Sequence, residues 1–259
     1  NIYKTFNPGT INEKVALNGL SLKLNEGDFV TVIGGNGAGK STMLNAVAGV
    51  WPVDEGQIII DGTDVTKLSE YKRAAYLGRV FQDPMTGTAA TMGIEENLAL
   101  AKRRGKTRLL RPGITKAERA EYKELLKILN LGLEDRLTSK VGLLSGGQRQ
   151  ALTLLMATLQ KPKLLLLDEH TAALDPKTAA KFLDITDKIV NRDHLTTLMI
   201  THNMKDAIAH GNRLIMMMNG KIVLDIQGEE KKKLTVKQLL DKFEEASGEE
   251  FSNDSAILG

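Results

Sequence analysis

The segment from Gly34 to Ser41 combines small residues with one lysine and one hydroxyl. Its sequence, Gly34-Gly35-Asn36-Gly37-Ala38-Gly39-Lys40-Ser41, fits the pattern G-x-x-x-x-G-K-[ST] in full. Small residues allow several backbone N–H groups to turn inward and form a nest around phosphate oxygens. Lys40 would reach the β- and γ-phosphates as a point charge, and the Ser41 hydroxyl would ligate Mg²⁺. The segment therefore predicts a nucleoside triphosphate site, and a glycine-rich turn without a ligand is the alternative.

A second group of chemically active residues follows the apolar run Leu164–Leu167. Asp168 comes directly after this run, and Glu169 comes next. A carboxylate at the end of a buried strand can hold Mg²⁺ near the phosphates through water. The adjacent carboxylate can orient and deprotonate an attacking water. Alone, the two could be surface acids at an ordinary strand end; together with the glycine-rich segment they predict phosphoryl-transfer chemistry.

The glycine-rich segment lies between the elements that a phosphate site needs. Phe29–Ile33 is an apolar run that predicts a buried strand ending at Gly34. Apolar residues at helical spacing predict a helix over Ser41–Val50. A strand, a glycine loop and a helix in this order form a phosphate-binding unit, and the helix N-terminus adds partial positive charge at the same point.

Strands and helices alternate at both ends of the chain, whereas the middle is mainly helical. The further predicted strands are Ile58–Asp61, Leu164–Leu167 and Leu195–Thr201, followed by a hairpin in which Asn219-Gly220 joins Leu214–Met218 to Lys221–Ile226. The further predicted helices are Glu118–Leu131, Gln148–Leu159, Pro176–Arg192 and Thr235–Ala246. This order indicates an α/β core with an inserted helical lobe. The last dozen residues are expected to be loose.

Composition excludes several classes of protein. The 259 residues are 42% hydrophobic and 26% charged, which argues against disorder and coiled coils. Lys and Arg exceed Asp and Glu by 35 − 32 = 3, a surplus too small to predict nucleic-acid binding. The absence of Cys excludes disulfides, cysteine metal sites and thiol catalysis. No apolar run reaches the roughly 18–20 residues that span a bilayer, and no signal peptide is visible.

The densest charge run is Lys102–Arg111, with the sequence KRRGKTRLLR. One interpretation is a solvated loop. The other is contact with an acidic partner or a lipid headgroup.

The pentapeptide Leu144-Ser145-Gly146-Gly147-Gln148 lies between the two phosphate motifs and opens a predicted helix. Ser145 could simply cap that helix, but capping does not require two glycines and a glutamine. At this point the sequence resembles the ATP-binding cassette (ABC) family, the nucleotide-binding subunits of ABC transporters. The pentapeptide matches the signature motif of that family without a change, and the resemblance covers roughly Tyr3 to Ile226.

The resemblance implies a fold. It is a P-loop NTPase (RecA-like) α/β core with a mainly parallel sheet, an N-terminal antiparallel β part and an inserted α-helical subdomain. In one ABC ATPase domain, the catalytic core would be 1–86 and 160–226, the helical signature subdomain 87–159, and a C-terminal helical tail 227–259.

The resemblance also implies residue roles. Gln82 matches the Q-loop glutamine, Asp175 the D-loop aspartate and His202 the switch histidine near the γ-phosphate. Phe6 aligns best with the aromatic that stacks on adenine, with Tyr3 as the competing choice. The expected catalytic residues are Glu169 as general base, with His202, Gln82 and Lys40. The expected ATP-binding residues are Phe6, Gly34, Gly35, Asn36, Gly37, Ala38, Gly39, Lys40, Ser41, Thr42, Ser145, Gly146, Gly147, Gln148 and Asp175. Ser41, Gln82 and Asp168 are the expected Mg²⁺ ligands.

The function implied by the resemblance is ATP hydrolysis that powers a transporter. Two cassettes would pair head to tail, with Ser145 and Gly147 of one acting on the ATP held by the other. The expected partners are integral membrane permease subunits, a second copy of the chain and, indirectly, an extracellular substrate-binding protein, at the cytoplasmic face of the cell membrane. No nucleic-acid partner is expected. The alternatives are a non-transport ABC ATPase of repair, translation or cluster assembly, and a non-hydrolysing regulatory subunit.

The sequence departs from the family pattern at two places, and two stretches indicate a subgroup of the family. The stretch Asn7–Lys14 is longer than the usual turn after the stacking aromatic and is expected near the base or ribose. His170 replaces the proline of many members. The Asn7–Lys14 loop and the stretch Thr171–Asp175 look similar to bacterial importers of amino acids, including aromatic ones.

Overall fold

The computed structural model describes residues 1–106 and 113–247. The chain separates into two compact units. The first is formed by Asn1–Arg73 together with the chain from His194 onward, and the second is Ala74–Asp193. The predicted helical subdomain, 87–159, falls inside the second unit, whereas the predicted catalytic core contributes residues to both.

In the first unit, the strands lie in the order β10-β9-β3-β8. β3 (Phe29–Ile33) has five buried residues and runs parallel to both β8 (Thr197–Ile200) and β9 (Arg213–Met218). A strand with parallel neighbours on both sides is expected to be apolar throughout, which explains the run FVTVI. β9 turns back into β10 (Lys221–Gln227) through Asn219 and Gly220, whose φ angles are 49° and 73°. This confirms the predicted tight Asn-Gly turn.

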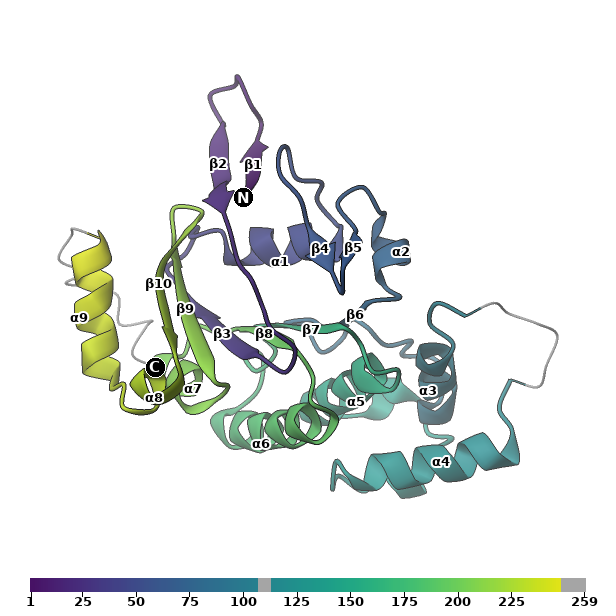
Figure 1. Ribbon diagram of the computed structural model, residues 1–259. Helices are drawn as coiled ribbons and strands as arrows, with labels where there is room; N and C mark the ends of the chain where they lie inside the picture. The colour runs from purple at the N-terminus through teal and green to yellow at the C-terminus, as the bar shows by residue number, and fades with distance from the viewer. Residues whose placement is uncertain (107–112, 248–259) are drawn as a thin grey trace. The chain divides into compact units, whose positions relative to one another are not determined.

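An antiparallel hairpin, β1 (Ile2–Phe6) with β2 (Lys14–Leu20), opens the chain and extends away from the sheet (Figure 1). The first unit also contains the short strands β4 (Ile59–Ile60) and β5 (Thr63–Asp64). Its helices are α1 (Lys40–Ala48), α2 (Glu70–Arg73), α7 (Met204–Ala209), α8 (Gly228–Lys232) and α9 (Val236–Ser247).

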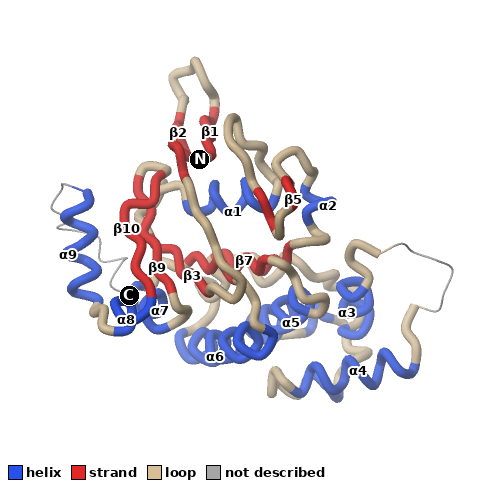
Figure 2. Tube along the Cα trace, in the orientation of Figure 1, coloured by secondary structure: helices blue, strands red, loops and turns tan. Residues whose placement is uncertain are grey.

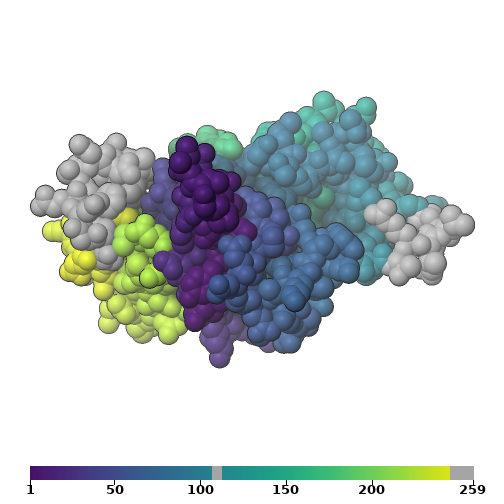
Figure 3. Space-filling model, turned by 90° about the horizontal axis from the view of Figure 1, so that it is seen from above, coloured from purple at the N-terminus to yellow at the C-terminus, as the bar shows by residue number. Residues whose placement is uncertain are grey.

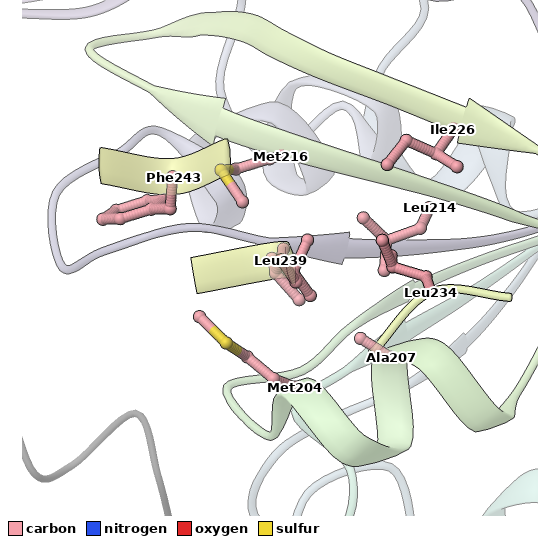
Figure 4. Packing of buried hydrophobic residues seen from close by; sticks show 9 residues of the cluster. Met204, Ala207, Leu214, Met216, Ile226, Leu234, Leu239 and Phe243 are labelled. Atoms are coloured by element: carbon pink, nitrogen blue, oxygen red, sulfur yellow. The ribbon is translucent and has the colours of Figure 1, made fainter. Parts of the chain in front are cut away.

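The C-terminal helix α9 packs on the β9–β10 hairpin and α7, and buries an apolar cluster there (Figure 4). Leu239 and Phe243 project from α9 toward Met204 and Ala207 of α7 and toward Met216 of β9. The cluster consists of Ile33, Met204, Ala207, Leu214, Met216, Ile226, Leu234, Leu239 and Phe243. Since Ile33 ends β3 and Met204 begins α7, the helix supports both segments from one side.

The second unit is mainly helical, as the blue segments of Figure 2 show. Its strands β6 (Leu77–Val80) and β7 (Leu164–Asp168) run parallel and pair with each other. Its α-helices are α3 (Ile94–Lys102), α4 (Lys116–Lys127), α5 (Gly146–Thr158) and α6 (Pro176–Asp193), with 3₁₀ turns at Leu133–Asp135 and Val141–Leu143. α5 contacts α3, α4 and α6, so it is the central helix of this unit.

The α/β fold with parallel strands, an antiparallel N-terminal part and inserted helices confirms the expected fold class. The predicted strand Ile58–Asp61 was too long, since β4 pairs only at Ile59 and Ile60 before the turn at Asp61-Gly62. β2, β6, α3 and α7 carry no clear period in the sequence, and their pairing and packing partners define them. The expected loose end, 248–259, lies outside the described residues.

The basic run is described only over 102–106, and 107–111 lie outside the described residues. In the described part, Lys102 pairs with Glu121 at 2.5 Å and Arg103 with Glu118 at 3.4 Å. Arg104 donates to the carbonyls of Ala157 and Gln160, both at 3.2 Å. These three cations are therefore engaged inside the second unit.

Candidate functional site

The glycine-rich segment follows β3 directly and leads into α1, as predicted. A Cβ atom on Gly34 would overlap the carbonyl oxygen of Met217. A Cβ atom on Gly39, whose φ is 101°, would lie 2.5 Å from the carbonyl oxygen of Ala16. The β9–β10 hairpin and β2 therefore press on the loop from outside, and only glycine fits at these two positions.

The first turn of α1 has N–H groups available for an anion. The N-cap residue is Gly39, which offers no side chain to accept from these N–H groups. The buried Lys40 lies across the loop, and its Nζ donates to the carbonyls of Gly34 at 2.6 Å and Gly35 at 3.1 Å. Ser41, the second residue of α1, is exposed beside it. A positive helix end, a lysine and a hydroxyl within one loop fit a phosphate chain and its cation.

His202 follows β8 and is exposed at the end of that strand. Ile200 is paired with Val32 in parallel register, and the N–H of Thr201 donates to the carbonyl of Val32 at 3.1 Å. The next residue, Asn203, caps α7 by accepting from the N–H groups of Lys205 and Asp206. Because β3 and β8 run parallel, His202 lies at the same sheet edge as the glycine-rich loop.

The two aromatic candidates for the base have different surroundings. Phe6 is half-buried and makes an edge contact with Trp51, with ring centroids 5.0 Å apart. It ends β1 directly opposite Lys14, the first residue of β2. Tyr3 is paired with Asn18, and its hydroxyl would lie 3.0 Å from a Cβ atom on Gly19. Phe6 is thus at the loop end of the hairpin, and Tyr3 is farther back along β1.

In the second unit, Asp168 ends β7 and Glu169 follows in a left-handed conformation with φ 45°. One oxygen of Asp168 lies 3.3 Å from a guanidinium nitrogen of Arg79, and both side chains are about 15% exposed or less. The Arg79 guanidinium also lies over the Phe81 ring, 4.6 Å from its centroid. A non-glycine residue with positive φ costs of order 1–3 kcal/mol and is concentrated at functional positions.

Gln82 and Glu169 are brought to the same end of neighbouring strands. Val80 of β6 is paired with Leu167 of β7, and the strands are parallel, so both side chains follow at one edge. Gln82 and the two carboxylates therefore lie at the carboxyl ends of two paired strands.

Gln150 is a positioning residue that the sequence did not single out. It is fully buried on α5, and its Nε2 donates to the carbonyl of Phe81 at 2.7 Å and to the carbonyl of His170 at 2.9 Å. One amide therefore ties the backbone beside Gln82 to the backbone beside Glu169. In the sequence, its position on the predicted helix just after the pentapeptide was the signal that could have pointed to it.

The pentapeptide motif forms the N-terminus of α5. Ser145 is the N-cap: its hydroxyl accepts from the N–H of Gln148 at 3.3 Å, and the Gln148 side chain accepts from the N–H of Ser145 at 3.2 Å. The capping interpretation is thus correct for Ser145. A hydroxyl also keeps its own hydrogen to donate, so the cap does not exclude contact with a phosphate.

The two glycines of the motif lie near the segment that contains Asp175. A Cβ atom on Gly147 would overlap the Thr178 methyl group, and one on Gly146 would lie 3.7 Å from Leu174. Asp175 accepts from the N–H of Thr178 at 3.1 Å. Hydrogen bonds from the Thr178 side chain and backbone lower the pKa of the exposed Asp175 carboxyl. This carboxylate therefore stays ionised at the start of α6.

Each unit thus gathers its own share of the predicted residues. The first holds Phe6, the loop from Gly34 to Thr42, and His202; the second holds Gln82, the pentapeptide motif, Asp168, Glu169 and Asp175. Among the described residues, no group of three or more His, Asp and Glu is arranged to hold a metal by itself. The expected Mg²⁺ ligands Ser41, Gln82 and Asp168 supply a hydroxyl, an amide and a carboxylate, which are the oxygen donors that Mg²⁺ prefers.

Comparison with known proteins identifies close relatives. The profile of the family described as ABC transporter matches residues 17–172. A tyrosine transport ATP-binding protein of Clostridioides difficile (strain R20291) is 49% identical over 240 residues, covering 92% of this chain and 93% of the relative. The methionine import ATP-binding protein MetN of Rhizobium etli is 38% identical over 212 residues, covering 80% of this chain and 56% of the relative.

A solved structure has the same fold. The ATP-binding cassette MJ0796, a dimer in a post-hydrolysis state with ADP and Pi, superposes with a TM-score of 0.74 at 29% identity, covering 88% of this chain and 96% of the other. In the described part of this chain, no helix has the length and apolar character needed to cross a membrane.

Proposed function

Because the chain belongs to the ABC transporter family, we propose that it powers a bacterial importer of amino acids, with aromatic amino acids as the first candidates. The chain is an ATPase, which converts ATP and water to ADP and phosphate. The observation that carries the importer proposal is the 49% identity to a tyrosine transport ATP-binding protein across nearly the full length of both chains. The methionine import relative belongs to the same broad substrate class.

The first unit binds the nucleotide. Phe6 stacks on the adenine, and the backbone N–H groups from Gly34 to Thr42 surround the phosphates. Lys40 exchanges its contacts with the Gly34 and Gly35 carbonyls for contacts with phosphate oxygens, since a charged acceptor makes the stronger hydrogen bond. His202 orients the γ-phosphate from the end of β8. The glycine cradle and the uncapped N-terminus of α1 support these roles.

The second unit supplies the residues that act on water. Glu169 accepts a proton from the attacking water while the water oxygen bonds to the γ-phosphorus, and the bond from that phosphorus to the bridging oxygen breaks. Bound Mg²⁺, held by Ser41 and Gln82 with support from Asp168, would neutralise the charge that develops on the phosphate oxygens. Gln150 holds the backbone segments beside Gln82 and Glu169 at a fixed separation through its two hydrogen bonds.

Two copies pair head to tail in the working state. Ser145 and Gly147 of one copy then donate to the triphosphate held by the other, from the N-terminus of α5. The dimer of the relative MJ0796, with ADP and Pi, supports this arrangement. ATP favours the closed pair because it binds that state more tightly than the open one.

The partners are permease subunits in the membrane, and the chain works at the cytoplasmic face. An extracellular substrate-binding protein delivers the amino acid to those permeases. The relatives named above are transport and import proteins, so the alternative of an ABC ATPase for repair, translation or cluster assembly gains no support from them.

Capture of the permease tests the proposal. A tagged copy of the chain is expressed in its host, membranes are dissolved in mild detergent, and captured proteins are identified by mass spectrometry. We expect a multi-span membrane protein in amounts comparable to the chain. We also expect ATP-dependent uptake of labelled tyrosine after both are placed in liposomes together with the substrate-binding protein. Glu169→Gln is the matched control, which should assemble but not transport. Capture without any integral membrane protein would contradict the importer proposal.

A further inference from the structure

Lys14 lies next to the phosphate loop, although no motif includes it. Its Nζ would be 3.4 Å from a Cβ atom on Gly37 of the loop. Lys14 is also two residues before Ala16, whose carbonyl oxygen presses on Gly39. Both contacts come from β2, so the start of this strand lies against the loop.

The register of the hairpin links this lysine to the base-stacking candidate. Lys14 and Phe6 are direct partners across β1 and β2. Directly opposite residues of an antiparallel pair have Cβ atoms about 4.5–5.5 Å apart on one face. One end of the hairpin therefore carries an aromatic ring and a cation side by side, and the cation reaches the loop that holds phosphates.

The long segment Asn7–Lys14 is stabilised by hydrogen bonds between its own residues. The Glu13 carboxylate accepts from the N–H of Gly9 at 2.6 Å, and the N–H of Glu13 donates to the carbonyl of Thr10 at 3.0 Å. Thr10 in turn donates to the carbonyl of Asn7 at 2.8 Å. The carboxylate of Glu13, which is adjacent to Lys14 in the chain, is therefore bonded within the turn. Lys14 itself lies at the start of β2.

The charge of Lys14 is not neutralised inside the described part of the chain. There, no carboxylate oxygen lies within 4.0 Å of its Nζ, and the side chain is exposed. The neighbouring Lys4 differs, since it pairs with Asp54 at 2.8 Å. In the space-filling view, the N-terminal hairpin (darkest purple) is open on the face that is drawn (Figure 3).

We propose that Lys14 is a second cation for the phosphate chain of the bound nucleotide, in addition to Lys40. This inference rests on the proposed function, because it assumes that the loop binds ATP. Lys40 contacts the phosphates from within the loop, whereas Lys14 reaches them from β2 outside it. The long turn of this chain thus adds affinity for phosphate to a hairpin whose aromatic residue binds the base.

Nucleotide titration by isothermal calorimetry tests the inference. Lys14→Ala should weaken ATP binding by about fivefold to twentyfold, since a charge-assisted contact at a partly exposed site is lost. ADP should lose affinity as well, and adenosine should bind both proteins equally. Lys14→Arg should keep most of the affinity. The difference between wild type and Lys14→Ala should shrink as salt is raised, because exposed charges are screened.

The matched control is Lys23→Ala, which removes another exposed lysine of the first unit. It should bind ATP as the wild type does, and thermal melting should show that every variant is folded. Equal ATP affinity of Lys14→Ala and wild type would overturn the inference while leaving the proposed function intact. An equal loss of adenosine affinity in Lys14→Ala would also overturn the inference, because it would show that Lys14 contacts the base or the ribose. A wild-type chain that does not bind ATP would overturn the proposed function itself.

Discussion

Glu169 is the proposed general base, and its backbone has an unfavourable left-handed conformation. Its φ of 45° is uncommon for a residue with a side chain, and its carbonyl accepts from the N–H of Ala172 at 2.9 Å. The buried His170 that follows packs edge-on against Phe182, with ring centroids 5.2 Å apart. The contacts after Glu169 thus hold the strained turn in place and keep the carboxylate at the end of β7.

Glu169→Gln tests the general-base role. The amide keeps the size and the turn but cannot accept a proton, so turnover should fall by about 10²–10⁴-fold. Binding of ATP should be unchanged, since Glu169 does not touch the phosphates in this proposal. Phosphate release and ATP titration on the same preparation measure both quantities. Near-normal turnover would remove Glu169 from this role.

At the scale of elements, α9 supports the segment that carries His202. Leu239 and Phe243 cover Met204, which lies two residues after His202, and the cluster also includes Ile33, directly before the phosphate loop (Figure 4). The N-terminus of α9 is itself capped, because Thr235 and Gln238 exchange side-chain and backbone hydrogen bonds. Helix α9 is therefore part of the core of the first unit.

Phe243→Ala tests the support by α9. Removal of a buried ring should lower the free energy of unfolding by about 3–5 kcal/mol, through lost burial and the cavity left behind. Lys237→Ala, at an exposed position of the same helix, should change it by less than about 0.5 kcal/mol. Urea melts of both variants measure the difference. Equal stability of the two would show that α9 does not pack as described.

At the scale of the whole molecule, the proposed mechanism requires two copies of the chain. Ser145 and the N-terminus of α5 lie in the second unit, and the phosphate loop lies in the first. In the proposed mechanism, the α5 terminus serves the nucleotide of a second copy. The nucleotide would then join two surfaces, and its hydrolysis would weaken their contact.

Light scattering tests this pairing. The Glu169→Gln protein with saturating ATP should shift from the mass of a monomer, 28.3 kDa, to about twice that value. ADP or nucleotide-free protein should remain monomeric. Ser145→Arg should prevent the shift, because a bulky cation would replace the small hydroxyl at the interface. A protein that stays monomeric with ATP would argue strongly against the shared site.

The sequence by itself determined those features whose functional residues and supporting elements are adjacent in the chain. The phosphate loop, the strand before it and the helix after it are consecutive, so glycine spacing and one apolar run were enough to predict them. The same holds for Asp168-Glu169 after β7, for the Asn219-Gly220 turn and for the helices α5 and α6, whose caps and periods are local.

Only the tertiary structure decided the features that depend on residues far apart in the chain. β6 is a strand because β7 pairs with it, and Gln150 matters because Phe81 and His170 lie beside it. Lys14 gained a proposed role because the register of β1 and β2 turns it toward Gly37. Sequence spacing carries no information about such contacts, since pairing across strands and packing between helices are set by the fold as a whole.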